Sequence, residues 1–313
     1  MKQRCWEHDY CEPCFYMITV VTEPKRDCLG ALQVEPGGAA TVSLSAIGEM
    51  VREVWRRTSA VYPGVEACEC VVMPDHFHGI LWVKERLARH VGHIVKAFKR
   101  VSEQECRSRG LLLEPNPSSV PAAAPAARLW EPGFQDSILL RRGQLKAMAN
   151  YIADNPRRLA AKRTSPALFT VAAKLEIAPG RPPCAAIGNR FLLKHPLKHQ
   201  VQISRRIAPT ELAARHEELL YAAEHGAVLV SPCISPGEKA IARAALDAGR
   251  PLIVLFSNGF APHYKPPGRY FDACAAGRLL MLAPFPYHRQ RQTITREQCL
   301  ELNAWAQTIV ETA

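Results

Sequence analysis

Two apolar segments separated by only two residues constrain the fold more than any other feature of the chain. VEACECVVM (65–73) and HFHGILWV (76–83) are rich in β-branched and aromatic residues, and Pro74-Asp75 between them is a typical turn sequence. Because successive side chains of a β-strand point to opposite faces, His76 and His78 share one face of their strand. The sequence therefore predicts two buried strands joined by a turn, with two imidazoles close enough to bind one metal ion.

Segments with strand or helix periodicity surround this pair. Strands are predicted at 15–23 and 134–142, and helices at 45–59, 84–109 and 143–155. The last helix is expected to stop at Pro156, because proline lacks the N–H that a helix interior needs. The order β-α-β-β-α-β-α is a split βαβ or ferredoxin-like layout with one additional helix at its end. That helix can cross the open face of the antiparallel sheet.

The pattern changes at about residue 184, where short apolar strands begin to alternate with helices. The strands are predicted at 184–189, 199–204, 227–231, 251–257 and 278–285, and the helices at 210–225, 237–249, 268–277 and 295–311. Such alternation indicates a parallel sheet with helices on both faces, a Rossmann-like domain. The predicted fold class is an α+β ferredoxin-like domain followed by an α/β Rossmann-like domain.

Composition places the boundaries of these domains. We expect a first domain at 1–165, a linker rich in proline and small residues at 166–183, and a second domain at 184–313. The segment at about 111–128 contains EPNPSSVPAAAPAAR, in which proline and alanine replace any periodic apolar pattern. This low complexity predicts a mobile loop inside the first domain.

The charge of the chain favours a polyanionic partner. There are 40 Lys and Arg residues against 29 Asp and Glu residues, a formal charge of +11. Nucleic acid fits this excess, and simple solubility is the alternative explanation. No run approaches the roughly 18 apolar residues of a membrane span, and MKQRCWEHDY at the start lacks the apolar core of a signal peptide. We therefore expect a cytoplasmic protein outside the membrane.

Eleven cysteines are scattered along the chain, and without an export signal they are expected to be free thiols. The opening run of Cys5, His8, Cys11 and Cys14 is an exception, because its even spacing is one that zinc can use. Four ligands so close together make a cramped site, and no second ligand pair follows. A zinc site and reduced, partly buried cysteines are both open at this point.

Three motifs in order along the first half resemble those of a known family. MPDHFHGIL (73–81), WEPGFQDSILL (130–140) and YIADNP (151–156) are similar to motifs of the REP-associated tyrosine transposases of the HUH endonuclease superfamily. The resemblance covers about residues 10–163. It implies a ferredoxin-like catalytic domain that binds single-stranded DNA, often beside a hairpin. Such a domain cuts the strand through a transient 5′-phosphotyrosine link and frees a 3′-hydroxyl.

The same resemblance implies roles for four residues. Tyr151 matches the nucleophile, and His76 and His78 match the metal-binding pair. Asn155 matches a third metal ligand, and its spacing of four from Tyr151 puts both on one helix face. The implied metal is Mg²⁺ or Mn²⁺, which neutralises charge on a phosphodiester during displacement. Phe77 is expected to point the other way, into the core.

Basic side chains near these motifs are candidates for contacts with DNA phosphates, which position a strand without reading its sequence. The candidates are Lys96, Lys99, Arg100, Arg141, Arg142, Arg157 and Arg158. A solvated surface is the alternative for each of them. Trp55, Trp82 and Trp130 are candidates either for base stacking or for the core. The expected partner is single-stranded DNA with a hairpin, bound by a monomer or a homodimer.

The second half resembles the Rossmann-like domain of DNA-processing protein A and related SLOG domains in GNRFLL (188–193), AVLVSPCISPGEKAIARAAL (227–246) and PLIVLFSNGF (251–260). Such folds bind ligands at the carboxyl ends of their strands, where helix N-termini offer N–H groups to phosphate. Candidate nucleotide- or phosphate-binding residues are Gly188, Asn189, Ser204, Arg205, Ser235, Gly237 and Glu238. A nucleotide, single-stranded DNA and a purely structural role are all open for this domain.

The hypothesis from the sequence is a metal-dependent, single-stranded DNA endonuclease and strand transferase that uses Tyr151. A DNA-binding or nucleotide-sensing regulator that keeps the nuclease fold without cleavage is the main alternative. A metal-dependent hydrolase of small phosphoesters is a third. Only the tyrosine mechanism forms a covalent adduct with DNA, so an adduct separates the three functions.

Overall fold

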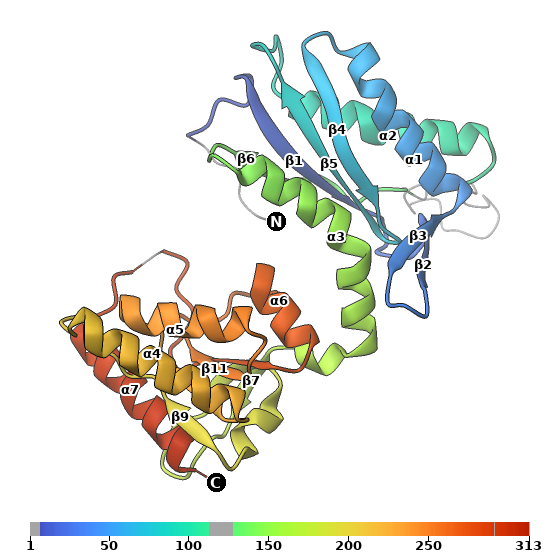
Figure 1. Cartoon of the computed structure of the whole chain (residues 1–313). Helices are drawn as coiled ribbons and strands as arrows, with labels where there is room; N and C mark the ends of the chain where they lie inside the picture. The colour runs from blue at the N-terminus through green and yellow to red at the C-terminus, as the bar shows by residue number, and fades with distance from the viewer. Residues whose placement is uncertain (1–6, 113–127, 291, 313) are drawn as a thin grey trace. The chain divides into compact units, whose positions relative to one another are not determined.

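The protein consists of two compact units, Met1–Ala160 and Ala161–Ala313, each with its own main β-sheet (Figure 1). The structure is a computed structural model that describes residues 7–112, 128–290 and 292–312. The expected Pro/Ala-rich loop at about 111–128 lies almost wholly outside these residues. Within them, no helix combines the length and the apolar character needed to cross a membrane. The ten cysteines of this part are free thiols.

The first unit has the predicted order of strands and helices, with one additional hairpin. Its elements are β1 (Cys14–Val21), β2 (Gly30–Val34), β3 (Ala40–Leu44), α1 (Ala46–Val61), β4 (Val65–Val72), β5 (His76–Val83), α2 (Gly92–Ser108), β6 (Gln135–Leu139) and α3 (Gln144–Thr164), whose last turn belongs to the second unit. The hairpin is β2–β3. The main sheet has the order β4-β5-β1-β6, and every neighbouring pair is antiparallel.

Two of the predicted helices have different ends in the structure. Helix α2 begins at Gly92 instead of residue 84, because the N–H groups of Leu87 and Val91 bond to backbone carbonyls near the N-terminus. Helix α3 does not stop at Pro156 but continues to Thr164. Proline costs the helix one hydrogen bond, and burial of side chains on both sides of Pro156 offsets that cost.

Strand β5 separates the core of the first unit from the face that carries the histidines. Phe77 is fully buried between Trp55 of α1 and Phe98 of α2, with ring centroids 4.8 and 5.0 Å from its own. The expectation that Phe77 enters the core is confirmed. Alternate residues of the same strand, His76 and His78, point to the opposite face.

Helix α3 covers that opposite face, while α1 and α2 cover the first (Figure 1). Ile152 of α3 packs on Met17, Ile80 and Leu139, one residue from each of the three strands β1, β5 and β6. All four side chains are buried. The predicted crossing of the sheet by the terminal helix is therefore present.

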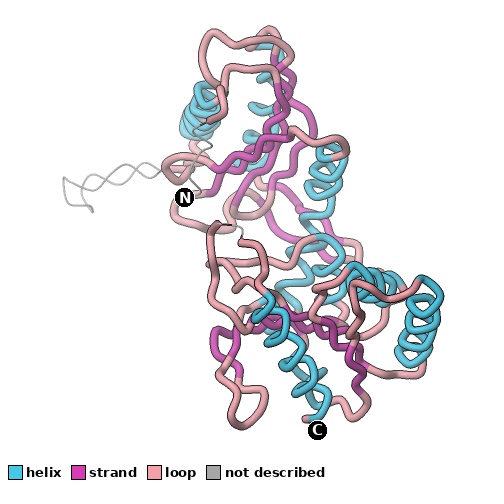
Figure 2. Tube along the Cα trace, turned by 90° about the vertical axis from the view of Figure 1, so that its left-hand side faces the viewer, coloured by secondary structure: helices cyan, strands magenta, loops and turns pink. Residues whose placement is uncertain are grey.

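The second unit is a mixed sheet with helices on both faces. Its elements are η1 (Pro166–Phe169), β7 (Ala172–Leu175), β8 (Cys184–Gly188), η2 (Arg190–Lys194), β9 (Lys198–Gln200), α4 (Pro209–Glu224), β10 (Val228–Ser231), α5 (Pro236–Asp247), β11 (Leu252–Leu255), α6 (Gly268–Ala275), β12 (Leu279–Ala283) and α7 (Arg296–Glu311). The strand order is β7-β8-β12-β11-β10-β9. Helices α4, α5 and α6 pack on one face and α7 on the other, and Figure 2 shows helices on both sides of this sheet.

Two expectations for this unit were wrong in part. Strands β9 to β12 are parallel as predicted, but β8 is antiparallel to β12, because no long helix lies between β8 and β9 to carry the chain back. The expected linker at 166–183 contains η1 and the strand β7, which pairs with β8. These residues therefore belong to the second unit.

Gly79 is required by the packing of β5 against α1. A Cβ atom at this position would lie 2.7 Å from Cε2 of Trp55 and 2.8 Å from Cζ of Phe77, both in the closed core. We expect Gly79→Ala to lower the free energy of unfolding by about 1–3 kcal/mol through overpacking. Urea unfolding followed by tryptophan fluorescence measures this. Gly37→Ala is the control, since nothing lies within 4 Å of a Cβ there; equal stability of the two variants would contradict the prediction.

Candidate active site

The two histidines lie side by side where β5 begins. Their ring centroids are 4.7 Å apart and their planes are inclined by 78°. In the register of the sheet, Val21 of β1 lies opposite His76, and Thr19 lies opposite His78. The geometry expected from the His-x-His spacing is therefore present.

His76 is held by a carboxylate that precedes it in the chain. Its Nδ1 lies 2.5 Å from Oδ1 of Asp75, and Nζ of Lys25 lies 3.2 Å from Oδ2 of the same carboxylate. Burial by itself would raise the pKa of Asp75, but the hydrogen bond and attraction from His76 and the charge of Lys25 hold that pKa well below its usual range. Asp75 is thus an anion hydrogen-bonded to the Nδ1 edge of the His76 ring.

His78 and Tyr151 meet across 73 residues of sequence. Nδ1 of His78 lies 2.8 Å from the hydroxyl oxygen of Thr19, and the His78 and Tyr151 ring centroids are 5.8 Å apart. On Tyr151, Cζ of Arg158 lies 5.5 Å from the ring centroid. His78 and Arg158 are both buried, whereas Tyr151 is partly exposed. The phenol therefore contacts an imidazole and a guanidinium and keeps a path to solvent.

Asn155 lies one turn after Tyr151 on α3. Its side chain is buried, and Nδ2 donates a hydrogen bond of 2.7 Å to the carbonyl oxygen of Tyr151. No donor in the described part of the chain bonds to Oδ1, so this amide oxygen keeps its acceptor capacity. Two imidazoles and one amide oxygen are a donor set that fits a divalent cation. Among the described residues, no group of three or more His, Cys, Asp or Glu side chains is placed to hold a metal ion.

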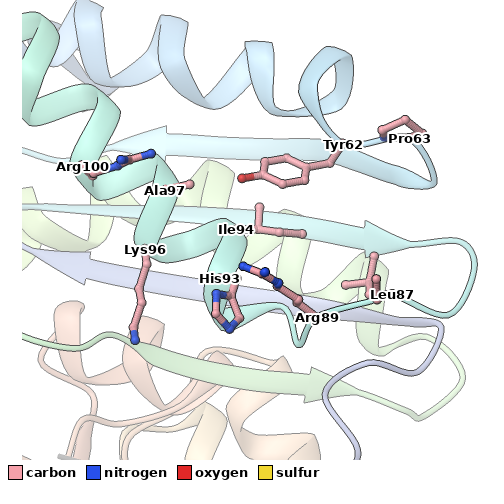
Figure 3. A pocket seen from close by; sticks show the side chains of 10 residues that line it. Tyr62, Pro63, Leu87, Arg89, His93, Ile94, Lys96, Ala97 and Arg100 are labelled. Carbon is pink, nitrogen blue, oxygen red and sulfur yellow. The ribbon is translucent and has the colours of Figure 1, made fainter.

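Lys96 and Arg100, two predicted DNA contacts, line a pocket of about 560 Å³ beside α2 (Figure 3). Arg89 and His93 line it as well, and Tyr62 points its hydroxyl toward α2. None of the four basic side chains forms an ion pair with a described residue. Because α2 packs on the face that holds Phe77, this pocket and the histidines are on opposite faces of the sheet.

The other predicted DNA contacts differ in whether their side chains are already bonded within the protein. Lys99 donates to the carbonyl oxygens of Glu131 and Gly133 at 2.5 and 2.7 Å, and burial lowers its pKa. Arg157 pairs with Asp154. Arg141 and Arg142 are exposed at the loop before α3. Lys99 thus holds the backbone at Glu131 and Gly133, which its position on a basic helix did not indicate.

The tryptophans separate into core and surface. Trp55 and Trp130 are buried, and Nε1 of Trp130 donates to Oγ of Ser102. Trp82 is 37% exposed and stacks on Phe15 with a centroid distance of 5.2 Å. Only Trp82 of these three offers a face near the surface.

The cysteine-rich start of the chain is described only in part. Cys5 lies outside the described residues. Nε2 of His8 lies 2.9 Å from the hydroxyl of Tyr16, and Cys14 begins strand β1. Of the described members of this run, His8 is thus engaged with Tyr16 and Cys14 lies in β1.

In the second unit, the candidate phosphate-binding residues do not form one group. Gly188 pairs with Leu280 near the amino end of β12, and Asn189 follows it. Ser235, Gly237 and Glu238 instead follow the carboxyl end of β10. Because β8 runs antiparallel to β12, its carboxyl end lies at the opposite end of the strands from the carboxyl end of β10. Ser204 and Arg205 follow β9 on the side of α5.

Glu238 fills the position at the start of α5 where a phosphate was expected. Its side chain is 3% exposed. Oε1 accepts from the N–H of Ile203 at 3.2 Å, and Oε2 accepts from those of Ile234 and Ser235 at 2.6 and 3.1 Å. Ser235 Oγ accepts from the Glu238 N–H and completes a capping box. The N–H groups that would cradle an anion are already bonded within the chain.

Comparison with known proteins gives distant similarities. No family model matches the chain. An uncharacterised protein of Haemophilus influenzae is 20% identical over 173 residues, which are 49% of this chain and 86% of that protein.

Three solved structures are similar to parts of the chain. A REP-associated tyrosine transposase bound to a REP hairpin is 18% identical, with 49% of this chain and 73% of the other covered and a TM-score of 0.34. A candidate transposase of Deinococcus radiodurans is 17% identical, with coverage of 49% and 97% and a TM-score of 0.30. DNA processing protein A of Helicobacter pylori, which binds single-stranded DNA, is 17% identical, with coverage of 45% and 66% and a TM-score of 0.33. These are the two groups that the sequence motifs resemble. With similarity this distant, function rests on the residues of the chain itself.

Removing the Glu238 carboxylate tests its role at the start of α5. Glu238→Ala would leave three backbone N–H groups without their acceptor, and we expect a loss of more than about 2 kcal/mol of stability. Amide hydrogen exchange at Ile203, Ile234 and Ser235 should become faster. Glu217→Ala, at an exposed position of α4, is the control. Unchanged exchange at the three amides would show that the carboxylate does not hold them.

Proposed function

We propose that the protein is a metal-dependent enzyme that cleaves and rejoins single-stranded DNA through a covalent link to Tyr151, at sites beside a hairpin. The observation that carries this proposal is the contact of Tyr151 with His78, on a sheet face where a second histidine lies 4.7 Å from the first. A partly exposed phenol beside two imidazoles is an arrangement for nucleophilic attack on a phosphodiester. A structural tyrosine needs no such neighbours.

In the proposed reaction, Oη of Tyr151 attacks the phosphorus of a phosphodiester. The new bond joins Oη to a 5′-phosphate, the bond between phosphorus and the 3′-oxygen breaks, and the proton lost by the phenol is balanced by the one that the 3′-hydroxyl gains. Attack by a 3′-hydroxyl in the reverse direction restores the phenol. Because one ester replaces another in each step, cleavage and rejoining need no external energy source. Arg158, over the Tyr151 ring, orients the phenol.

His76, His78 and Asn155 are the residues that would hold the metal. A divalent cation bound there supplies charge neutralisation for the phosphoryl group during displacement. Imidazole nitrogens suit transition metals better than Mg²⁺, which prefers oxygen ligands. With two imidazoles and one amide oxygen, the donor set favours Mn²⁺ over Mg²⁺.

Basic side chains supply the attraction for DNA. Arg89, Lys96 and Arg100 line one pocket without an acidic neighbour in its lining, so phosphate can replace their hydration without displacing a carboxylate. The pocket lies on the sheet face opposite Tyr151. DNA that reaches both places must pass around an edge of the sheet, which favours a substrate longer than a few nucleotides.

The finer fold assignments belong to the same proposal. The antiparallel order β4-β5-β1-β6 with its helix crossovers is that of a ferredoxin-like domain, and the parallel strands β12-β11-β10-β9 with helices on both faces are Rossmann-like. We assign the second unit to contacts with DNA and not to a nucleotide at α5, because Glu238 occupies that helix start. The protein would act in the cytoplasm.

The covalent adduct is the decisive test. Incubation of the protein with labelled single-stranded hairpin DNA and Mn²⁺ should give an adduct that survives denaturation, and Tyr151→Phe should abolish it because the nucleophilic oxygen is lost. Tyr221→Phe, at an exposed tyrosine of α4, should keep the adduct. DNA binding without an adduct across many substrates would favour the regulatory protein, and turnover of small phosphoesters that survives Tyr151→Phe would favour the hydrolase.

Charge reversal tests the pocket on α2. Arg100→Glu should weaken DNA binding and lower the dependence of log affinity on log salt by about 1, because one phosphate contact is lost. Arg56→Glu is the matched control, an exposed arginine on α1 with the same change of charge. Fluorescence anisotropy at several salt concentrations measures both. An equal loss in the two variants would show a general charge effect and no site.

A further inference from the structure

The turn before β5 is fixed more firmly than a surface turn needs to be. The carbonyl oxygen of Asp75 accepts from both the N–H and the hydroxyl of Thr22, at 3.1 and 3.0 Å, and Thr22 is fully buried. The carbonyl oxygen of Pro74 accepts from the N–H of Leu29 at 3.0 Å. The backbone of Asp75 is therefore held in place independently of its side chain.

The side chain of Asp75 is committed at both oxygens. Oδ1 lies 2.5 Å from Nδ1 of His76, and Oδ2 lies 3.2 Å from Nζ of Lys25. An ionised carboxylate can only accept hydrogen bonds. Nδ1 of His76 must therefore carry the proton, and the lone pair of the neutral ring is on Nε2.

The second histidine has a different kind of partner. Nδ1 of His78 lies 2.8 Å from the hydroxyl of Thr19, which can donate or accept. Thr19 fixes the position of that ring but leaves its tautomer open. The carboxylate of Asp75 thus imposes one tautomer on His76 by its chemistry.

We propose that Asp75 is a positioning residue of the metal site, which makes Nε2 of His76 the nitrogen offered to the cation. The inference rests on the proposed function, since the cation is the one bound by His76, His78 and Asn155. A carboxylate that accepts the second N–H of a ligating histidine fixes the ring and raises its basicity. Loss of such partners typically weakens metal binding 10- to 100-fold.

Two substitutions separate the hydrogen bond from the charge. Asp75→Ala removes the acceptor and the charge, whereas Asp75→Asn keeps the side-chain length and removes the charge, with an amide that can either accept from or donate to His76. The backbone bonds of residue 75 to Thr22 are unaffected by either change, so both variants are expected to fold. Glu35→Ala, an exposed acidic residue of the β2–β3 hairpin, is the control.

The first measurement needs neither metal nor DNA. Long-range ¹H–¹⁵N NMR of protein with ¹⁵N-labelled histidine reports which ring nitrogen of His76 carries the proton. Wild-type protein should show a protonated Nδ1, whereas Asp75→Asn and Asp75→Ala should each show a mixture of tautomers, because an amide can accept or donate and alanine does neither. A single Nδ1-protonated form in Asp75→Ala would overturn the inference.

The second measurement is Mn²⁺ binding in the absence of DNA, followed by electron paramagnetic resonance of the free ion. We expect affinity to fall 10- to 100-fold in Asp75→Ala, to fall less in Asp75→Asn and to be unchanged in Glu35→Ala. At saturating Mn²⁺, adduct formation by Asp75→Ala should recover, because Tyr151 is intact. Unchanged Mn²⁺ affinity in Asp75→Ala would overturn the positioning role and leave the proposed function standing. Failure of wild-type protein to form any adduct would overturn the proposed function, while the NMR result would still decide the Asp75–His76 pair.

Discussion

The packing of α3 across the first sheet is the interaction on which the candidate site depends. Ile152 is 2% exposed and rests on Met17, Ile80 and Leu139, so one side chain ties the helix to three strands. Removing a buried side chain of this size typically costs about 2–5 kcal/mol, which is a large part of the stability of a domain. Since Tyr151 is the neighbour of Ile152, the same contact fixes the proposed nucleophile beside His78. Apolar burial thus supplies the precision that the proposed chemistry needs.

Local patterns were sufficient to predict most elements of both units, but not the β2–β3 hairpin or β7, and they also predicted which β5 side chains point to each face. Alternation in HFHGILWV placed Phe77 in the core and the histidines on the other face, as the structure confirms. Pro156 was misread, because the rule for proline concerns a helix by itself, and here burial around the proline keeps the helix intact. Thr19 and Lys25 could not be assigned to the site beforehand, since their roles follow from the register between β1 and β5 and from a turn. Asp75 did have a signal, its position directly before His76.

In the second unit, the direction of β8 determines where the candidate phosphate-binding residues lie, and the sequence patterns did not indicate that direction. Gly188 ends β8 and Glu238 lies in the helix after β10, so the two residues would be at the same end of the sheet only if both strands were parallel. Because β8 pairs antiparallel with β12, Gly188 and Glu238 lie at opposite ends of the strands. A capping box is visible in a sequence as serine followed three residues later by glutamate, and Ser235 and Glu238 have that spacing. Ser235 and Glu238 therefore indicate a helix whose first N–H groups are bonded within the chain. Those N–H groups are then not free to bind a phosphate.

One strand serves both stability and the proposed chemistry, and this explains the unusual composition of β5. A strand covered by helices on both faces would ordinarily be apolar throughout, since unpaired polar groups are costly to bury. His78 is buried at 7% exposure, but its Nδ1 is matched by Thr19, and His76 is matched by Asp75. Each imidazole therefore has one nitrogen satisfied by a side chain from the sheet or its turn, which lowers the cost of burial and directs the other nitrogen. The hydrogen bonds that lower the cost of burying the histidines are the same ones that would orient them toward the proposed cation, so stability and positioning are not in conflict at this site.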